Sequence, residues 1–249
     1  MEIKYEDKIV AFIDVLGFSN LVYSDKLEPI SDYYNMILTD FKAAASKKEL
    51  EFIMISDSIV LHAPQSKDSF FAILKVLCSL QHKLLLKGIL IRGAISFGQL
   101  YVNETDNIIV GTGLINAYNL EKKAIYPRII IDRKIIPLYW QDSDDFLKST
   151  GRLICLTNCP PYVTDYPFLD LGMGVALDFQ PIRFTQVINT LKAQYYSNEH
   201  IAKYEWLKST ILYATKSSVK YLTSKKVKSK NEPKRIRLLT GFIKEFENI

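Results

Sequence analysis

The sequence has few of the residues that build zinc sites and disulfide frameworks. Its 249 residues include three cysteines (Cys78, Cys155 and Cys159) and three histidines. The cysteines have no paired metal-ligand spacing, and their odd number does not suit a disulfide framework. These scarcities exclude a zinc-stabilised domain and a disulfide-rich secreted domain. We therefore expect reduced thiols and a cytoplasmic location.

Long hydrophobic runs are also missing. No stretch approaches the roughly 20 consecutive apolar residues that a transmembrane helix needs, so no stable membrane insertion is expected. The first residues, MEIKYEDKIVAFID, place acidic side chains before the apolar run and offer no small-residue cleavage site, which argues against a signal peptide. With 48% hydrophobic and 24% charged residues, the composition is that of a globular protein and excludes general disorder.

The net charge of +5 is unevenly distributed along the chain. Residues 203–249 carry a net charge of +8 and residues 1–202 a net charge of −3. The basic cluster SKKVKSKNEPKR could suit nucleic acid or an anionic membrane. It contains no aromatic residue that could stack on bases, however. We interpret it as a solvated loop between helices and expect no nucleic-acid partner.

Alternating strand and helix patterns predict an α+β fold. Apolar, β-branched segments predict strands, and apolar residues at helical spacing predict helices. The expected strands are 8–15, a hairpin over 51–63 with its turn at 56–58, 88–102 paired with 108–110, and 127–132; the expected helices are 18–45, interrupted near Pro29, then 69–86 and 114–123. Hairpins alternating with crossover helices indicate a ferredoxin-like sheet with helices on one face.

Beyond this region the pattern is less regular. Residues 153–156 and 168–171 resemble strands, and the chain from Pro181 onward is mostly helical. No repeat or Gly/Ser linker is present. We therefore divide the chain into residues 1–180 and a helical C-terminal extension, 181–249, that packs on the sheet or on a partner subunit.

Two aspartates are the first candidates for chemistry. Asp14 lies inside an apolar strand, where an ionised carboxylate is unfavourable unless it is paired or metal-bound. The segment after it, Leu16, Gly17, Phe18 and Ser19, predicts a turn opening a helix, whose free N–H groups can bind an anion. Asp57 lies at a hairpin turn. Each has an ordinary alternative role, Asp14 as a helix cap and Asp57 as a turn residue. In a ferredoxin-like sheet the two can meet at one edge, and together with two Mg²⁺ or Mn²⁺ ions they could act in phosphoryl transfer.

Arg92 is a third candidate, because it interrupts an apolar strand and requires an anionic partner there. A phosphate and an internal carboxylate are equally good partners on sequence grounds. Five of the ten glycines also fall between positions 88 and 113, which indicates bulges or close backbone approaches.

The segments FIDVLGF, ISDSIVL, IRGAISFG and GTGLINAYNLEKKA resemble the class III nucleotidyl cyclases in order and spacing, over residues 7–132. The resemblance implies a cyclase domain over residues 1–180. It further implies that Asp14 and Asp57, with Ile13 as a further ligand, hold two Mn²⁺ or Mg²⁺ ions per site.

The sequence departs from the purine cyclases of this family. Ile53 replaces the base-reading Lys or Glu, and Ile108 is the nearest residue to the second base-reading position. The family's helical Asn and Arg fall on Ile115 and Asn119, with Asn116 one place away. The chain is more similar to the bacterial pyrimidine cyclases of Pycsar anti-phage systems. This implies synthesis of cyclic UMP or cyclic CMP, with UTP favoured over CTP, and a place for Arg92 near the phosphates or the base. The alternative is a catalytically silent homologue that binds a nucleotide and signals.

Class III cyclases share each active site between two cyclase domains, so the resemblance implies a homodimer here. Asn116 or Asn119 would reach the metal site of the partner subunit. Apolar residues on both faces of the sheet, around 53–55, Ile91 and Ile95, independently suggest an interface.

Overall fold

The computed structural model describes residues 3–23, 27–45, 50–150, 154–155, 168–169, 186–187, 189, 192, 201–224 and 232–248. The strands are β1 (Glu6–Val15), β2 (Glu51–Ile55), β3 (Ser58–Pro64), β4 (Ile91–Asn103), β5 (Ile108–Val110), β6 (Ile129–Ile131), β7 (Ile154–Cys155) and β8 (Phe168–Leu169). The helices are α1 (Phe18–Tyr23), α2 (Leu27–Ala45), α3 (Lys67–Leu86), α4 (Thr112–Glu121), α5 (Ile136–Tyr139), α6 (Ser143–Thr150), α9 (Ile201–Ser224) and α10 (Glu232–Glu247), with a 3₁₀ turn, η1, at Arg133–Ile135.

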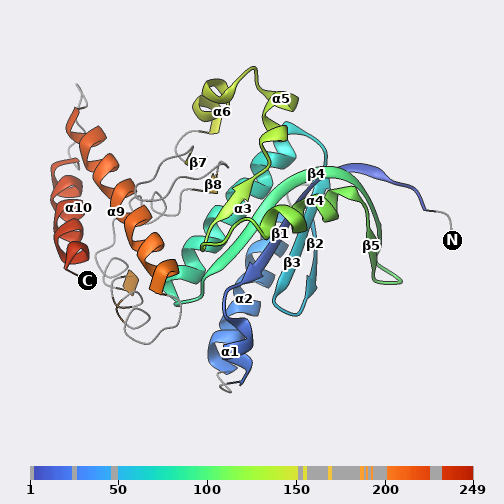
Figure 1. Ribbon diagram of the computed structural model, residues 1–249, viewed down its shortest axis with the longest axis horizontal. Helices are drawn as coiled ribbons and strands as arrows, with labels where there is room; N and C mark the ends of the chain where they lie inside the picture. The colour runs from blue at the N-terminus through green and yellow to red at the C-terminus, as the bar shows by residue number, and fades with distance from the viewer. Residues whose placement is uncertain are drawn as a thin grey trace.

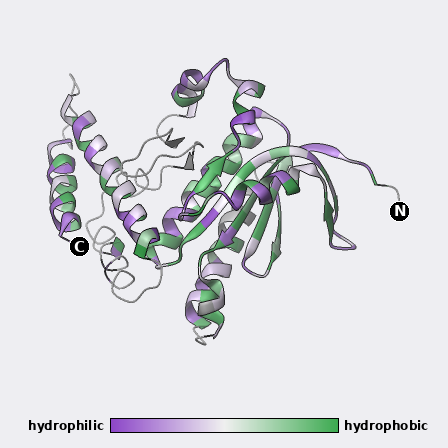
Figure 2. Cartoon of the chain, in the orientation of Figure 1, coloured by the Kyte–Doolittle hydropathy of each residue, from purple (hydrophilic) through white to green (hydrophobic). Residues whose placement is uncertain are grey.

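The strands form one mixed sheet with the order β2-β3-β1-β4-β6-β8-β7, and β5 pairs with β4 at the rim (Figure 1). Strand β1 pairs antiparallel with β3 and β4 on its two sides, whereas β4 and β6 run parallel. The expected α+β sheet, with the first strand next to the second hairpin, is therefore confirmed. Figure 2 shows hydrophobic positions recurring along these strands.

The alternation of side chains along β1 gives the sheet two different faces. Ile9, Ala11 and Ile13 are fully buried in the main core, which α2 and α3 complete. Val10 and Phe12 point to the opposite face, in a cluster with Ala117 of α4. Because successive strand residues point to opposite faces, Asp14 lies on the α4 face.

The position of α4 differs from the expectation that helices cover one face only. Its buried residues Ala117 and Leu120 pack on the face opposite α2 and α3. The reason lies in two glycines, since a Cβ on Gly98 would collide with the backbone of Gly113, and a Cβ on Gly113 would press against the Val10 side chain of β1 and the Gly98 carbonyl. Their missing side chains allow α4 to lie directly on β4.

Helix α3 is long and apolar enough to cross a membrane by length and composition alone. In the structure its residues Phe70, Ile73, Leu77 and Leu84 are fully buried in the main core below the sheet. This placement is that of the core helix of a globular domain.

The C-terminal helices join the sheet through a second core. Trp206, Leu207 and Ile211 of α9 cluster with Ala94 of β4 and Leu120 of α4, and the ring of Trp206 stacks on Tyr126. The domain boundary expected at residues 180/181 lies outside the described residues.

Candidate functional site

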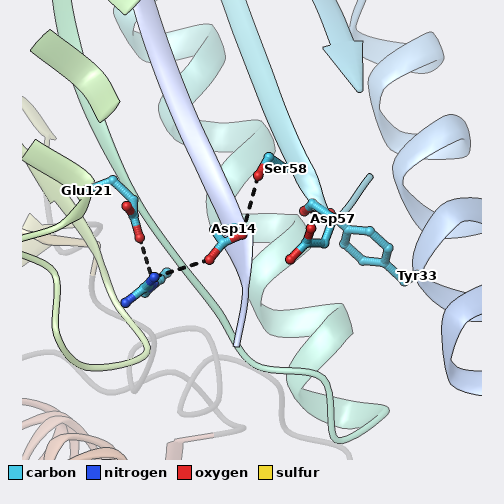
Figure 3. Close-up of polar contacts among 6 residues, drawn as sticks. Asp14, Tyr33, Asp57, Ser58 and Glu121 are labelled. Carbon is cyan, nitrogen blue, oxygen red and sulfur yellow. Dashed lines mark hydrogen bonds and ion pairs between the residues drawn. The ribbon is translucent and has the colours of Figure 1, made fainter. Parts of the chain in front are cut away.

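Asp14 occupies the end of β1, on the α4 face of the sheet. Its side chain is 21% exposed and lies between neighbouring strands. The Ser58 hydroxyl at the start of β3 donates to Oδ1 at 3.4 Å, and Nη2 of Arg92 on β4 lies 3.3 Å from Oδ2 (Figure 3). The carboxylate is thus held by the strands on both sides of β1.

Asp57 lies in the tight turn between β2 and β3, and helix α2 fixes this turn. The hydroxyl of buried Tyr33 donates to the Asp57 carbonyl at 2.6 Å, and the hydroxyl of Tyr34 donates to the Ser56 carbonyl at 3.1 Å. Ser56 has a φ of 56°, in the left-handed region that tight turns use. Burial and the Asp57 charge raise the pKa of Tyr33, so its hydroxyl stays protonated as a donor. The carbonyl contacts hold Asp57 beside Asp14 (Figure 3).

The structure brings the two aspartates into direct interaction. Burial raises the pKa of Asp14 above its ordinary value, and the negative charge of Asp57 and a hydrogen bond with it raise the pKa further. Arg92 opposes this shift in part. Two neighbouring carboxylates that repel each other form a favourable place for a divalent cation.

The donor set fits Mg²⁺ or Mn²⁺. Both ions prefer oxygen ligands, and Mg²⁺ is commonly bound by one or two carboxylates together with substrate phosphates and water. Among the residues that the structure describes, no group of three or more His, Cys, Asp or Glu side chains could enclose a metal. Asp14 and Asp57 would therefore supply only part of a coordination shell. The Ile13 side chain is a hydrocarbon without a donor atom, so only the Ile13 carbonyl could contribute.

Arg92 has internal carboxylate partners on both sides. Besides Asp14, its Nε lies 2.6 Å from Oε1 of Glu121, at the end of α4. The Glu121 side chain is 4% exposed; burial raises its pKa, and the positive charge of Arg92 opposes that shift. Of the two partners considered for Arg92, the structure shows the internal carboxylate. Glu121 was missed by sequence reasoning, although it is a charged residue in the buried stripe of α4 with Ala117 and Leu120.

The turn expected to bind phosphates, Leu16 to Ser19, is present, but the N–H group of one of its residues is already hydrogen-bonded. Gly17 has a φ of 76°, and α1 begins at Phe18. The N–H of Leu16 donates to the carbonyl of Leu90 at 2.9 Å, so Leu16 has no free donor. The prediction that Leu16 contributes an N–H to a phosphate is wrong, because the β1–β4 pairing extends to it. Gly17, Phe18 and Ser19 remain predictions.

The other predicted residues lie further from the carboxylate pair. Ile53 is half-buried on β2, opposite Val60. Asn116 donates to the Phe97 carbonyl of its own chain at 3.1 Å, whereas Asn119 is exposed on α4. Neither asparagine is joined to Asp14 or Asp57 within the part of the chain that the structure describes.

The sequence matches no protein-family model and none of the curated proteins. Solved structures do resemble it. The adenylyl cyclase CyaB from P. aeruginosa has 18% identity and a TM-score of 0.47, over 68% of this chain and 94% of that chain. The guanylate cyclase domain of RhGC from Catenaria anguillulae, solved in complex with GTP, has 16% identity and a TM-score of 0.47, over 66% and 96%. The monomeric guanylyl cyclase domain of RhoGC from Blastocladiella emersonii has 17% identity and a TM-score of 0.46, over 68% and 98%.

These similarities are to the catalytic domains of adenylyl and guanylyl cyclases. With identities below 20% and TM-scores below 0.5, the likeness is one of fold.

Proposed function

We propose that the protein is a nucleotidyl cyclase that converts a pyrimidine nucleoside triphosphate, UTP in preference to CTP, into the 3′,5′-cyclic monophosphate and pyrophosphate. The observation that carries this proposal is the Asp14–Asp57 pair, held where β1 ends and β3 begins, beside a fixed arginine. The sequence resemblance to class III cyclases supports the same reading of these two aspartates.

Asp14 and Asp57 would hold Mn²⁺ or Mg²⁺, two ions per site. The ions would lower the pKa of the attacking 3′-hydroxyl and neutralise charge on the pyrophosphate leaving group. In the reaction the 3′-oxygen bonds to the α-phosphorus, the bond from that phosphorus to the bridging oxygen breaks, and the hydroxyl proton passes to solvent.

Arg92 would serve as a fixed cation for the phosphates. If Asp14 held a metal ion, the guanidinium would lose that partner and keep Glu121 at its Nε. Its Nη groups would then be available to an anionic oxygen, and guanidinium binds phosphate in a defined geometry. Glu121 therefore acts as a positioning residue for Arg92.

The preference for pyrimidines rests on the residues that replace purine readers. Ile53 has no polar group with which to read a purine edge, and it lies on the α4 face of the sheet with Val60. Through the resemblance to the Pycsar cyclases we extend the proposal to synthesis of a second messenger in bacterial anti-phage defence, in the cytoplasm.

The site would be completed by a second copy of the chain. Ile55, Ile115 and Tyr118 are 57%, 55% and 44% exposed; the last two belong to α4, and the ring of Tyr118 packs edge-on against Phe12 of the sheet. Burying such side chains contributes about 25 cal/mol per Å². Ile91 and Ile95 were also expected at this interface. In the structure they lie instead in the main core, on the side of the sheet that α2 and α3 cover. The exposed Asn119 would reach the partner's aspartates, whereas Asn116 would first have to release Phe97.

The test is an incubation of the purified protein with each of the four nucleoside triphosphates and Mn²⁺, followed by detection of pyrophosphate and cyclic product. The proposal predicts cyclic UMP, with less cyclic CMP and no purine product. Binding of UTP without turnover would instead indicate the silent nucleotide-binding homologue. No binding of any triphosphate would refute both.

A further inference from the structure

The C-terminal extension lies against the same face of the sheet as the candidate site. Trp206 and Leu207, in the second turn of α9, share a core with Leu85, Leu90 and Ala94. These partners flank the start of β4, where Arg92 lies. Figure 1 shows the orange, N-terminal end of α9 close to the point where α3 ends and β4 begins. The stacking of Trp206 on Tyr126, with ring centroids 5.3 Å apart, fixes this end of the helix.

Lys203 projects from that fixed end of α9. It precedes Trp206 by three residues and Leu207 by four, so it lies on the same side of the helix as these anchors. Lys203 is half-buried. Burial lowers its pKa, and the positive charge of Arg92 lowers it further. No ion pair joins Lys203 to a carboxylate in the described part of the chain.

Lys203 and Arg92 thus lie on the same face of the sheet, Lys203 one helical turn from side chains that pack beside the start of β4 and Arg92 at the second position of that strand. Arg92 is balanced by Asp14 and Glu121, but Lys203 is not. A partly buried cation beside another cation is unfavourable, and an anion bound between them would remove the repulsion. Metal ions held by the neighbouring Asp14 and Asp57 would bind a polyphosphate at this place. A lysine ammonium binds phosphate as a point charge.

We propose that Lys203 is a substrate-binding residue through which the C-terminal helix α9 contacts the phosphate chain of the nucleotide held at Asp14 and Asp57. The proposal rests on the function proposed above. On this proposal the C-terminal extension contributes directly to the candidate site. Helix α9, which lies outside the region that resembles cyclases, supplies one of the cationic side chains of the site.

The experiment measures binding of inorganic tripolyphosphate and of a non-hydrolysable UTP analogue, each with Mn²⁺, by isothermal titration calorimetry. The full-length wild type is compared with Lys203→Gln, Lys203→Arg and the matched control Lys208→Gln, a half-buried lysine one and a half turns further along α9. Thermal unfolding of each variant verifies the fold. We expect Lys203→Gln to weaken both ligands at least about tenfold, Lys203→Arg to retain most of the affinity, and Lys208→Gln to match the wild type.

The outcomes separate the two proposals. If the wild type binds both ligands and Lys203→Gln binds them equally well, Lys203 has no role and the proposed function stands. If Lys208→Gln loses as much affinity as Lys203→Gln, the effect is one of general charge and the assignment to Lys203 is wrong. If the wild type binds neither ligand, the proposed function fails first and the inference with it.

Discussion

Buried His62 should make the fold sensitive to mild acid. The side chain is 1% exposed, on β3 between Val10 and Glu51. Burial, reinforced by the positive charge of Lys8, lowers its pKa from 6.5 to about 4, and Glu104 opposes the shift. The Glu51 carboxylate lies 3.4 Å from Nδ1, but its side chain is 53% exposed and remains solvated, so it does not offset the burial.

The sign and size of the effect follow from proton linkage. Between pH 6.5 and pH 4 the unfolded chain binds a proton at this histidine and the folded chain does not, so stability falls as the pH falls. Above pH 6.5 the contribution of His62 to folding stability is fully present. At 1.36 kcal/mol per pKa unit, the loss reaches roughly 3 kcal/mol by pH 4.

The assay is urea denaturation at intervals between pH 8 and pH 4, for the wild type and for His62→Leu. Leucine is similar in volume and does not titrate. The other titratable groups contribute equally in both proteins, so their contributions cancel when the two unfolding free energies are subtracted. We expect the wild type to lose about 3 kcal/mol relative to His62→Leu over this range. Parallel pH profiles for the two proteins would refute the assignment of a buried, neutral His62.

Three further predictions concern the metal, the dimer and the sheet. Mn²⁺ should support faster turnover than Ca²⁺, which favours a larger and looser ligand shell, and equal rates would contradict the mechanism. A mixture of Asp57→Asn and Asn119→Ala proteins, each inactive alone, should recover activity through mixed dimers; silence despite proven subunit exchange would exclude a shared site. Gly93→Ala places a Cβ against Ile13 Cδ1 and should lower the unfolding free energy by about 1–3 kcal/mol, whereas Gly241→Ala, with open space around it, should not.

The strand pattern was accessible from the sequence because it depends on local order, and the carboxylate pair followed from the sheet topology that this pattern predicts. Apolar alternation located β1, and the central place of β1 in a hairpin-and-crossover sheet put Asp14 near the turn of the β2–β3 hairpin. Asp14 and Arg92 are each the one charged residue in an apolar strand segment. This marked them as positions that need a partner of opposite charge. The structure joins these two residues directly.

The partners supplied by other elements were not accessible in the same way. Glu121 and Tyr33 lie within helical stripes, where one polar residue among apolar ones does not reveal which strand or turn it faces. The bonded N–H of Leu16 depends on how far the β1–β4 ladder extends, which residue patterns do not fix. The place of α4 on the second face depends on the close approach of Gly98 and Gly113, two residues far apart in the chain.

Asp14 and Asp57 together are expected to form one divalent-cation site. The direct measurement is Mn²⁺ binding by electron paramagnetic resonance to the wild type, Asp14→Asn, Asp57→Asn and the control Asp7→Asn, an exposed carboxylate at the other end of the same strand. We expect saturable binding by the wild type and the control. We expect a loss of at least about tenfold in affinity for each site variant, with the thermal unfolding transition retained. Equal Mn²⁺ affinity in all four proteins, or none in the wild type, would show that the two aspartates do not form a cation site.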